Sequence, residues 1–106
     1  MRATLHTLEQ TIRQRRSADP TTSYVAKLSA RGRAKIAQKV GEEAVETVIA
    51  AMADDKAGVV GESADLLFHL MILLADLDLP FDAVLDELDR REGLSGIAEK
   101  AARPAD

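Results

Sequence analysis

Apolar residues along this chain recur at the spacing of helices, and no segment shows the alternation of a half-buried strand. In the first helix, Leu5, Leu8 and Ile12 follow the i, i+3, i+7 spacing, which predicts a helix over Thr4–Arg16. This helix ends in the segment SADPTTS, because Pro20 disfavours helical geometry at the residue before it.

The same periodicity, with its caps and breakers, predicts four more helices. Ser23 is a suitable N-cap for the second helix and Gly32 ends it. The fifth starts at Pro80 or Phe81, where proline is tolerated in the first turn, and Gly93 ends it. The predicted ranges are Tyr24–Ala30, Arg33–Ala53, Val59–Leu77 and Phe81–Arg91. The tail LSGIAEKAARPAD is predicted to form a short helical turn and a frayed end.

The third and fourth helices are long and are separated only by DDKAG, so they should form an antiparallel hairpin. The run LLFHLMILLA in the fourth helix is apolar nearly all round, which predicts burial on every side. A chain of 106 residues can hardly cover such a helix alone. We therefore predict one domain over residues 1–106, an all-α antiparallel bundle of about five helices that is completed by homodimerisation.

The composition is that of a globular protein, with 46% hydrophobic and 30% charged residues. Cysteine is absent, which excludes disulfides and thiolate metal sites. The N-terminal segment has no continuous apolar region typical of a signal peptide. The longest apolar run, Leu66–Ala75, is about half the length that spans a bilayer. We expect a cytoplasmic protein without a membrane or nucleic-acid partner.

The net charge of −4 conceals an asymmetry along the chain. Residues 1–41 contain nine Lys/Arg and two Asp/Glu, a net charge of +7, whereas residues 42–106 contain five and sixteen, a net charge of −11. A basic third beside an acidic remainder would suit an anionic ligand that carries a metal ion. Pairing between oppositely charged helices explains the asymmetry equally well.

Five charged residues of the third helix fall in a stripe about 100° wide, given about 100° of rotation per residue. They are Lys35, Lys39, Glu42, Glu43 and Glu46. On the fourth helix, Glu62, Asp65 and His69 share a face, and Asp76 continues that line two turns on. If the hairpin packs these stripes together, the carboxylates converge.

Converging carboxylates repel each other and are costly to bury, which indicates a compensating cation. All the candidate ligands are oxygen atoms, which favours Mg²⁺ or Mn²⁺. Nearby basic side chains would bind phosphate oxygens; they are Lys27, Arg31, Lys35 and Lys39. An alternative for the acidic stripe is a solvated face in which Lys39 pairs with Glu42 and Glu43. His69 is either a hydrogen-bonded core residue or a partner of the metal ligands that orients Glu62 or Asp65.

The pattern Glu43-x-x-Glu46, fifteen residues, then Glu62-x-x-Asp65 resembles the metal-binding pattern of the all-α nucleoside-triphosphate pyrophosphohydrolase superfamily. Three longer segments resemble the phosphoribosyl-ATP pyrophosphohydrolase family. They are SYVAKLSARGRAKIAQKVGEEAVETVIAA, ESADLLFHLMILLA and REGLSGIAEKAAR. The resemblance extends from Leu5 to Arg103. The helix-three residues are shared in type across the superfamily, so they do not by themselves fix the base or the sugar.

The resemblance implies hydrolysis of the α–β phosphoanhydride of phosphoribosyl-ATP, which gives phosphoribosyl-AMP and pyrophosphate in the second step of histidine biosynthesis. It also implies a functional link to phosphoribosyl-AMP cyclohydrolase, a domain to which some members are fused. The present sequence contains no such domain, so we expect the free-standing form.

With the resemblance in view, we expect Glu43, Glu46, Glu62 and Asp65 to hold Mg²⁺, with Mn²⁺ as a substitute. Glu42 is expected either to bind metal as well or to orient the attacking water, so Glu42 and Glu43 are the candidate catalytic residues. The triphosphate would be neutralised by Lys35 and Lys39, with outer candidates Lys27, Arg31 and Lys100. Two other functions stay open: a related enzyme that acts on (d)NTPs, and a non-enzymatic dimeric helical bundle.

Overall fold

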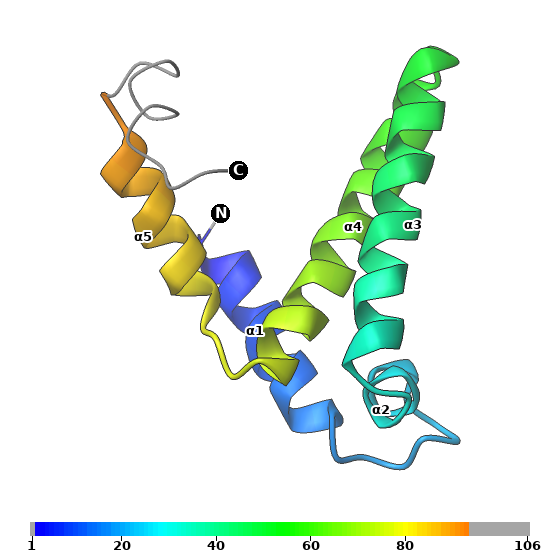
Figure 1. The fold of residues 1–106 in the computed structure, drawn as a ribbon, viewed down its shortest axis with the longest axis vertical. Helices are drawn as coiled ribbons and strands as arrows, with labels where there is room; N and C mark the ends of the chain where they lie inside the picture. Colours follow the sequence, from blue (N-terminus) through cyan, green and yellow to red (C-terminus); the bar gives the residue numbers. More distant parts are fainter. Residues whose placement is uncertain (1, 94–106) are drawn as a thin grey trace.

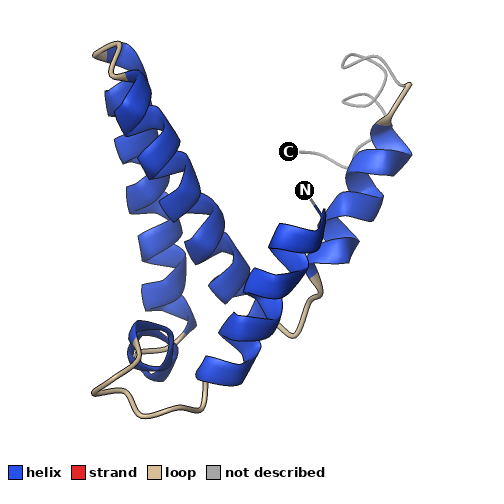
Figure 2. Cartoon of the chain, turned by 180° about the vertical axis from the view of Figure 1, so that it is seen from behind, coloured by secondary structure: helices blue, strands red, loops and turns tan. Residues whose placement is uncertain are grey.

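The computed structural model describes residues 2–93, and these residues form five α-helices and no strand (Figures 1 and 2). The all-helical fold predicted from the sequence is therefore confirmed for this part of the chain. The helices are α1 (Arg2–Arg15), α2 (Tyr24–Ala30), α3 (Arg33–Met52), α4 (Lys56–Asp76) and α5 (Phe81–Arg91). The helical turn predicted in the tail lies outside the described residues.

Local capping explains most of the helix boundaries. The Ser23 side chain accepts a hydrogen bond from the Ala26 backbone N–H at 3.2 Å, which caps α2 as predicted. Gly32 separates α2 from α3 with φ +95°, a backbone conformation that is strained for a residue with a Cβ. Pro80 is the N-cap residue of α5, and Gly93 follows its end with φ +86°. These four boundary signals were correctly identified in the sequence.

The turn between α3 and α4 is shorter than predicted, because α4 begins at Lys56 and not at Val59. Asp54 turns the chain with φ +56°, and the Asp55 side chain then accepts a hydrogen bond from the Gly58 N–H at 2.9 Å. A Cβ on residue 58 would collide with the Asp55 carboxylate. DDKAG therefore caps the next helix, whereas the sequence analysis interpreted the whole segment as a break between helices.

The hydrophobic core lies at one end of the α3–α4 hairpin, where the first turns of α3 and the last turns of α4 meet the other helices. Ile12, Ile36 and Ile72 are completely buried there. The full cluster of buried apolar residues comprises Ile12, Val25, Leu28, Ile36, Met71, Ile72, Ala75 and Phe81. All five helices contribute to it, so this cluster fixes the base of the hairpin in place.

Arginines of the basic N-terminal third reinforce this end of the molecule. Asp76, largely buried at the end of α4, accepts a hydrogen bond from Arg33 at 2.8 Å and lies 3.6 Å from the Arg16 guanidinium. The carboxylate of Glu9 on α1 accepts a hydrogen bond from the Phe81 N–H at 2.6 Å and so caps α5. The charge asymmetry had two interpretations, and one of them was pairing between oppositely charged helices. The ion pairs of Arg16 and Arg33 with Asp76 are such pairing.

The other half of the hairpin extends away from the core (Figure 1) and exposes a set of apolar side chains. Met52 is 83% exposed and Val60 71%, and the set also includes Val45, Val48, Ile49 and Leu67. The radius of gyration is 15.8 Å, whereas a compact chain of this length has about 13 Å. The single chain therefore leaves part of α4 exposed, as the sequence argument expected of a lone chain; burial on every side was predicted for the homodimer.

By length and composition α4 is also apolar enough to cross a membrane, since an 18-residue window of it has a mean hydropathy of 1.6. A mostly buried core helix of a soluble protein passes the same test, whereas 17% of this window is buried in the single chain. Here α4 packs along α3 and supplies Met71, Ile72 and Ala75 to the core, so its apolar character has a function inside a helical bundle.

Candidate metal and phosphate site

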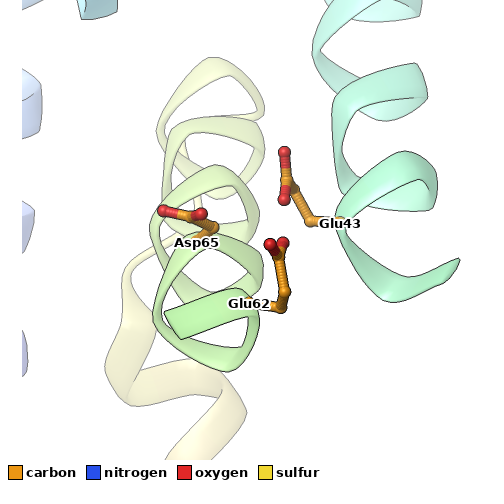
Figure 3. A group of neighbouring side chains, drawn as sticks. All are labelled: Glu43, Glu62 and Asp65. Atoms are coloured by element: carbon orange, nitrogen blue, oxygen red, sulfur yellow. The ribbon is translucent and has the colours of Figure 1, made fainter. Parts of the chain in front are cut away.

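Three carboxylates from the two helices of the hairpin meet in the middle of its length. Glu43 projects from α3, and Glu62 projects from α4 toward it, while Asp65 lies one turn further along α4 (Figure 3). One oxygen atom from each of the three lies within 4.8 Å of the others. The packing of the two acidic stripes, which the periodicity predicted, is thus present in the fold.

Two oxygen atoms of these carboxylates are buried without a hydrogen-bond partner. Glu43 is only 7% exposed; its Oε1 lies 3.6 Å from the Lys39 ammonium, whereas its Oε2 is buried and unpaired. Oε2 of Glu62 is also buried and unpaired. A buried carboxylate oxygen without a donor costs free energy, so native proteins normally give it a partner.

The close approach of the acids changes the protonation of Glu62. Its pKa is raised to about 7, first through a hydrogen bond with Glu46, then through one with Glu43 and through burial. Glu46 is exposed and does not belong to the group of three, although it lies within hydrogen-bonding reach of Glu62. The carboxyl of Glu62 therefore lies between two acidic neighbours that favour its protonated form.

The donor set fits a divalent cation of the hard type. All three side chains offer carboxylate oxygens, which are the ligands that Mg²⁺ and Mn²⁺ prefer. The unpaired oxygens of Glu43 and Glu62 are available for coordination. A cation there would also take the place of the proton that Glu62 retains through its hydrogen bonds with Glu46 and Glu43. Glu43, Glu62 and Asp65 are thus the residues best placed to hold the ion, with Glu46 beside them.

The predicted phosphate-binding residues line one cavity of about 290 Å³ between α2 and α3. The basic residues around it are Lys27, Arg31, Lys35 and Lys39. Lys100, the remaining candidate, lies outside the described residues. Because each of these side chains is cationic at neutral pH, the cavity, here called the basic cavity, suits an anion. The sequence analysis grouped these residues, but their arrangement around a single cavity follows only from the fold.

Glu42 lies at the edge of the basic cavity rather than in the carboxylate group. The Gln38 amide donates to it at 2.9 Å and the Lys39 ammonium is 3.5 Å away. These contacts, the Gln38 hydrogen bond first and then Lys39 and Lys35, lower the pKa of Glu42 and keep it ionised. Glu42 thus differs from Glu62, whose pKa is raised.

His69 does not orient a carboxylate. Its Nδ1 lies 2.7 Å from the backbone carbonyl oxygen of Asp65, and its Nε2 lies 2.7 Å from the Tyr24 hydroxyl. Of the two interpretations of His69 in the sequence, the hydrogen-bonded core residue describes these contacts. His69 is 6% exposed.

Tyr24 was not recognised as a site residue from the sequence, although it is the only tyrosine of the chain. It lines the basic cavity, and its ring packs against Phe68 and His69 with centroids 6.1 Å and 5.6 Å away. Burial raises the pKa of its hydroxyl, and the charges of Lys39 and Glu43 also act on it. Tyr24 therefore stands between the basic cavity and the acidic group.

Fold and chemistry together fit the class of all-α proteins that act on phosphate compounds with the help of a divalent cation. A family profile described as phosphoribosyl-ATP pyrophosphohydrolase matches residues 5–92. The chain belongs to the phosphoribosyl-ATP pyrophosphohydrolase family.

Its relatives match over nearly their whole lengths. The phosphoribosyl-ATP pyrophosphatase of Rhizorhabdus wittichii is 71% identical over 104 residues, which cover 98% of both chains. The protein of the same name from Novosphingobium aromaticivorans is 68% identical over 91% of this chain and 90% of the relative. The one from Zymomonas mobilis is 61% identical over 95% and 94%, respectively. The family resemblance seen in the sequence is therefore confirmed.

Proposed function

We propose that this protein is a Mg²⁺-dependent phosphoribosyl-ATP pyrophosphohydrolase, with Mn²⁺ as a substitute ion. It hydrolyses the α–β phosphoanhydride of phosphoribosyl-ATP to phosphoribosyl-AMP and pyrophosphate, the second step of histidine biosynthesis. Membership of the family and the names of the relatives support this substrate. The observation that carries the metal dependence is the pair of unpaired, buried oxygens on Glu43 and Glu62.

The residues divide the chemistry between them. Glu43, Glu46, Glu62 and Asp65 hold the ion, which supplies positive charge to the phosphate oxygens and acidifies a water molecule. Lys35 and Lys39 neutralise the triphosphate, and Lys27 and Arg31 in the same cavity are further candidates. Lys100, the remaining candidate, lies outside the described residues. Glu42 remains ionised at the junction of the two groups, where it orients the attacking water or adds a ligand.

The functional form is a homodimer of single-domain chains in the cytoplasm. Exposed apolar residues on the outer half of the hairpin support the dimer, since a second copy would remove Val45, Val48, Ile49, Met52 and Val60 from water. The product is the substrate of phosphoribosyl-AMP cyclohydrolase, which gives the functional link to that enzyme.

Substrate choice is tested by incubating the purified protein with phosphoribosyl-ATP, ATP and the four dNTPs, with and without Mg²⁺, and measuring pyrophosphate. We expect release from phosphoribosyl-ATP alone and only with the metal ion. Equal activity on dNTPs would indicate the broader nucleotide pyrophosphohydrolase instead. No release from any substrate would support a non-enzymatic helical bundle.

The metal-ligand role is tested with Glu46→Gln, which removes charge and almost no volume. We expect a drop in kcat of about 100-fold, within the range for loss of one electrostatic contributor. The matched control is Asp86→Asn, because Asp86 is an exposed carboxylate on α5 away from the carboxylate group and the basic cavity. Full kcat in a normally folded Glu46→Gln variant would exclude Glu46 from the metal site.

A further inference from the structure

A chain of two hydrogen bonds fixes the Tyr24 hydroxyl. The Asp65 carbonyl oxygen can only accept, so the Nδ1 of His69, 2.7 Å away, carries a proton and donates to it. In the neutral ring, Nε2 is then an acceptor, and the Tyr24 O–H, 2.7 Å from it, is the donor. The one proton of the Tyr24 hydroxyl is therefore used inside the protein.

This arrangement determines what Tyr24 can offer to a ligand. With its proton directed to His69, the oxygen has only lone pairs left, so it can accept a hydrogen bond and cannot donate one. Phosphate oxygens are acceptors and gain nothing from such a partner. A ligand hydroxyl, which carries a donor, fits it.

Tyr24 also stands at the border of two neighbouring hollows, since Tyr24 and Lys27 line both of them. One is the basic cavity. The second, of about 550 Å³, is here called the hydroxyl hollow, because its lining is Pro20, Thr21, Thr22, Ser23, Tyr24 and Lys27. Apart from Lys27 these side chains are uncharged at neutral pH, so the second hollow favours a neutral polar group over a phosphate.

The hydroxyl hollow offers donors and acceptors in fixed positions. Ser23 Oγ accepts from the Ala26 N–H, which leaves its own proton free to donate. The Thr22 hydroxyl donates to the Asp19 carbonyl oxygen at 3.2 Å, which leaves its lone pairs free to accept. Sugar hydroxyls both donate and accept, and they would satisfy this mixed lining.

We propose that the hydroxyl hollow binds the ribose joined to the triphosphate, and that the Tyr24 oxygen accepts a hydrogen bond from a ribose hydroxyl. This inference rests on the proposed function, because it places the triphosphate of the same ligand in the basic cavity. His69 acts as the positioning residue that holds Tyr24 in its acceptor state. Tyr24 thereby distinguishes the sugar from the phosphates.

The test compares three ligands in the presence of Ca²⁺, measured by calorimetry: ATP, 2′,3′-dideoxy-ATP and inorganic tripolyphosphate. The wild-type protein should bind ATP about tenfold more tightly than dideoxy-ATP, which is the value of one good hydrogen bond. In Tyr24→Phe, which keeps the ring that packs on Phe68, the preference for ATP over dideoxy-ATP should fall markedly. Tripolyphosphate binding should change less than about twofold, because Tyr24 gives nothing to phosphate.

A second variant tests the positioning residue. His69→Phe keeps an aromatic ring beside Tyr24 and removes the acceptor, so the preference for ATP over dideoxy-ATP should fall although Tyr24 is intact. Thr7→Val is the matched control: it removes a hydroxyl from an exposed position on α1 that lines neither hollow, and it should preserve the preference.

The possible outcomes separate the two proposals. If Tyr24→Phe weakens all three ligands equally, or if wild-type protein does not distinguish ATP from dideoxy-ATP, the ribose contact is wrong while phosphate binding stands. If wild-type protein binds none of the three ligands but hydrolyses phosphoribosyl-ATP, the ribose contact is wrong and the proposed function stands; if it also releases no pyrophosphate from phosphoribosyl-ATP, the proposed function fails and the ribose site fails with it. Circular dichroism of each variant verifies that the helices are intact.

Discussion

Glu43 on α3 and Glu62 on α4 face each other across the helical hairpin, and each keeps one buried carboxylate oxygen without a hydrogen-bond partner. The acidic neighbours favour the protonated form of Glu62: its pKa is raised first by the hydrogen bond with Glu46, then by the one with Glu43 and by burial. A protein that needed only a stable hairpin would be served better by apolar side chains at these positions. The pair therefore indicates a site that is completed by a cation.

Binding of Mn²⁺ should depend on this pair directly. We expect Glu62→Gln to weaken Mn²⁺ binding, followed by electron paramagnetic resonance, by at least about tenfold, because it removes a charged ligand from between Glu43 and Glu46. Asp86→Asn, the exposed control on α5, should bind like wild type. Equal affinity in the two variants would place the ion elsewhere.

The metal-free protein should lose stability as the pH rises. The pKa of Glu62 is about 7 in the folded chain against 4.5 for an ordinary carboxyl, so the folded state binds this proton more tightly than the unfolded state. Its stabilising contribution is complete below the lower value and disappears as the pH rises through the upper one. Glu62→Gln cannot titrate there.

The measurement is the melting temperature of wild type and Glu62→Gln across this interval, without divalent ions. Wild type should decline relative to the variant as the pH rises, and added Mg²⁺ should reverse the decline, because the ion binds the deprotonated form. Parallel curves for the two proteins would show that Glu62 titrates normally.

Asp76 should contribute much more to stability than its neighbour Asp78. Asp76→Asn removes the charge that two arginines share at a largely buried position, and we expect a loss of about 1–3 kcal/mol in the free energy of unfolding. Asp78 contacts Arg13 at 3.2 Å but its side chain is 94% exposed, so Asp78→Asn should change stability by less than about 0.5 kcal/mol. Urea denaturation of both variants decides this; equal effects would contradict the expectation.

Association should depend on the outer half of the hairpin. Val48→Glu places a charge in the exposed apolar set, so the molar mass from size-exclusion light scattering should fall from that of a dimer to that of a monomer. Gln10→Glu, which adds the same charge at an exposed position of α1, should leave the dimer intact. A wild-type protein that is a stable monomer at micromolar concentration would refute the dimer.

The sequence predicted the helices well because their signals are local. Apolar periodicity, the Ser23 cap and Gly32 act within a few residues, and α2 has the predicted bounds. The proximity of Glu43 and Glu62 was also predictable, because the acidic faces of two helices joined in one hairpin can pack against each other. The start of α4 was missed because Asp55 is both a turn residue and a good cap.

Contacts between distant segments were beyond the reach of periodicity. Nothing near Tyr24 in the sequence reveals that its hydroxyl meets His69, 45 residues away. By its spacing in the sequence, Asp76 continues the acidic face of α4. In the fold, however, it forms ion pairs with Arg16 and Arg33 and so stabilises the end of the molecule that contains the core. In both cases the partner is selected by how α1 and α2 pack, which depends on the whole fold.

The turn at Asp54 and Asp55 has a consequence for the chemistry of residues that lie about two to three helical turns from it. Because each helical residue adds about 100° of rotation, one extra residue in α3 or α4 between Glu43 and the turn, or between the turn and Glu62, would rotate these two side chains out of each other's reach. The length of this segment is therefore as much a requirement for the metal site as the identity of its acids. Asp55, whose side chain accepts a hydrogen bond from the Gly58 N–H, fixes where α4 begins and so sets the relative alignment of the two helices.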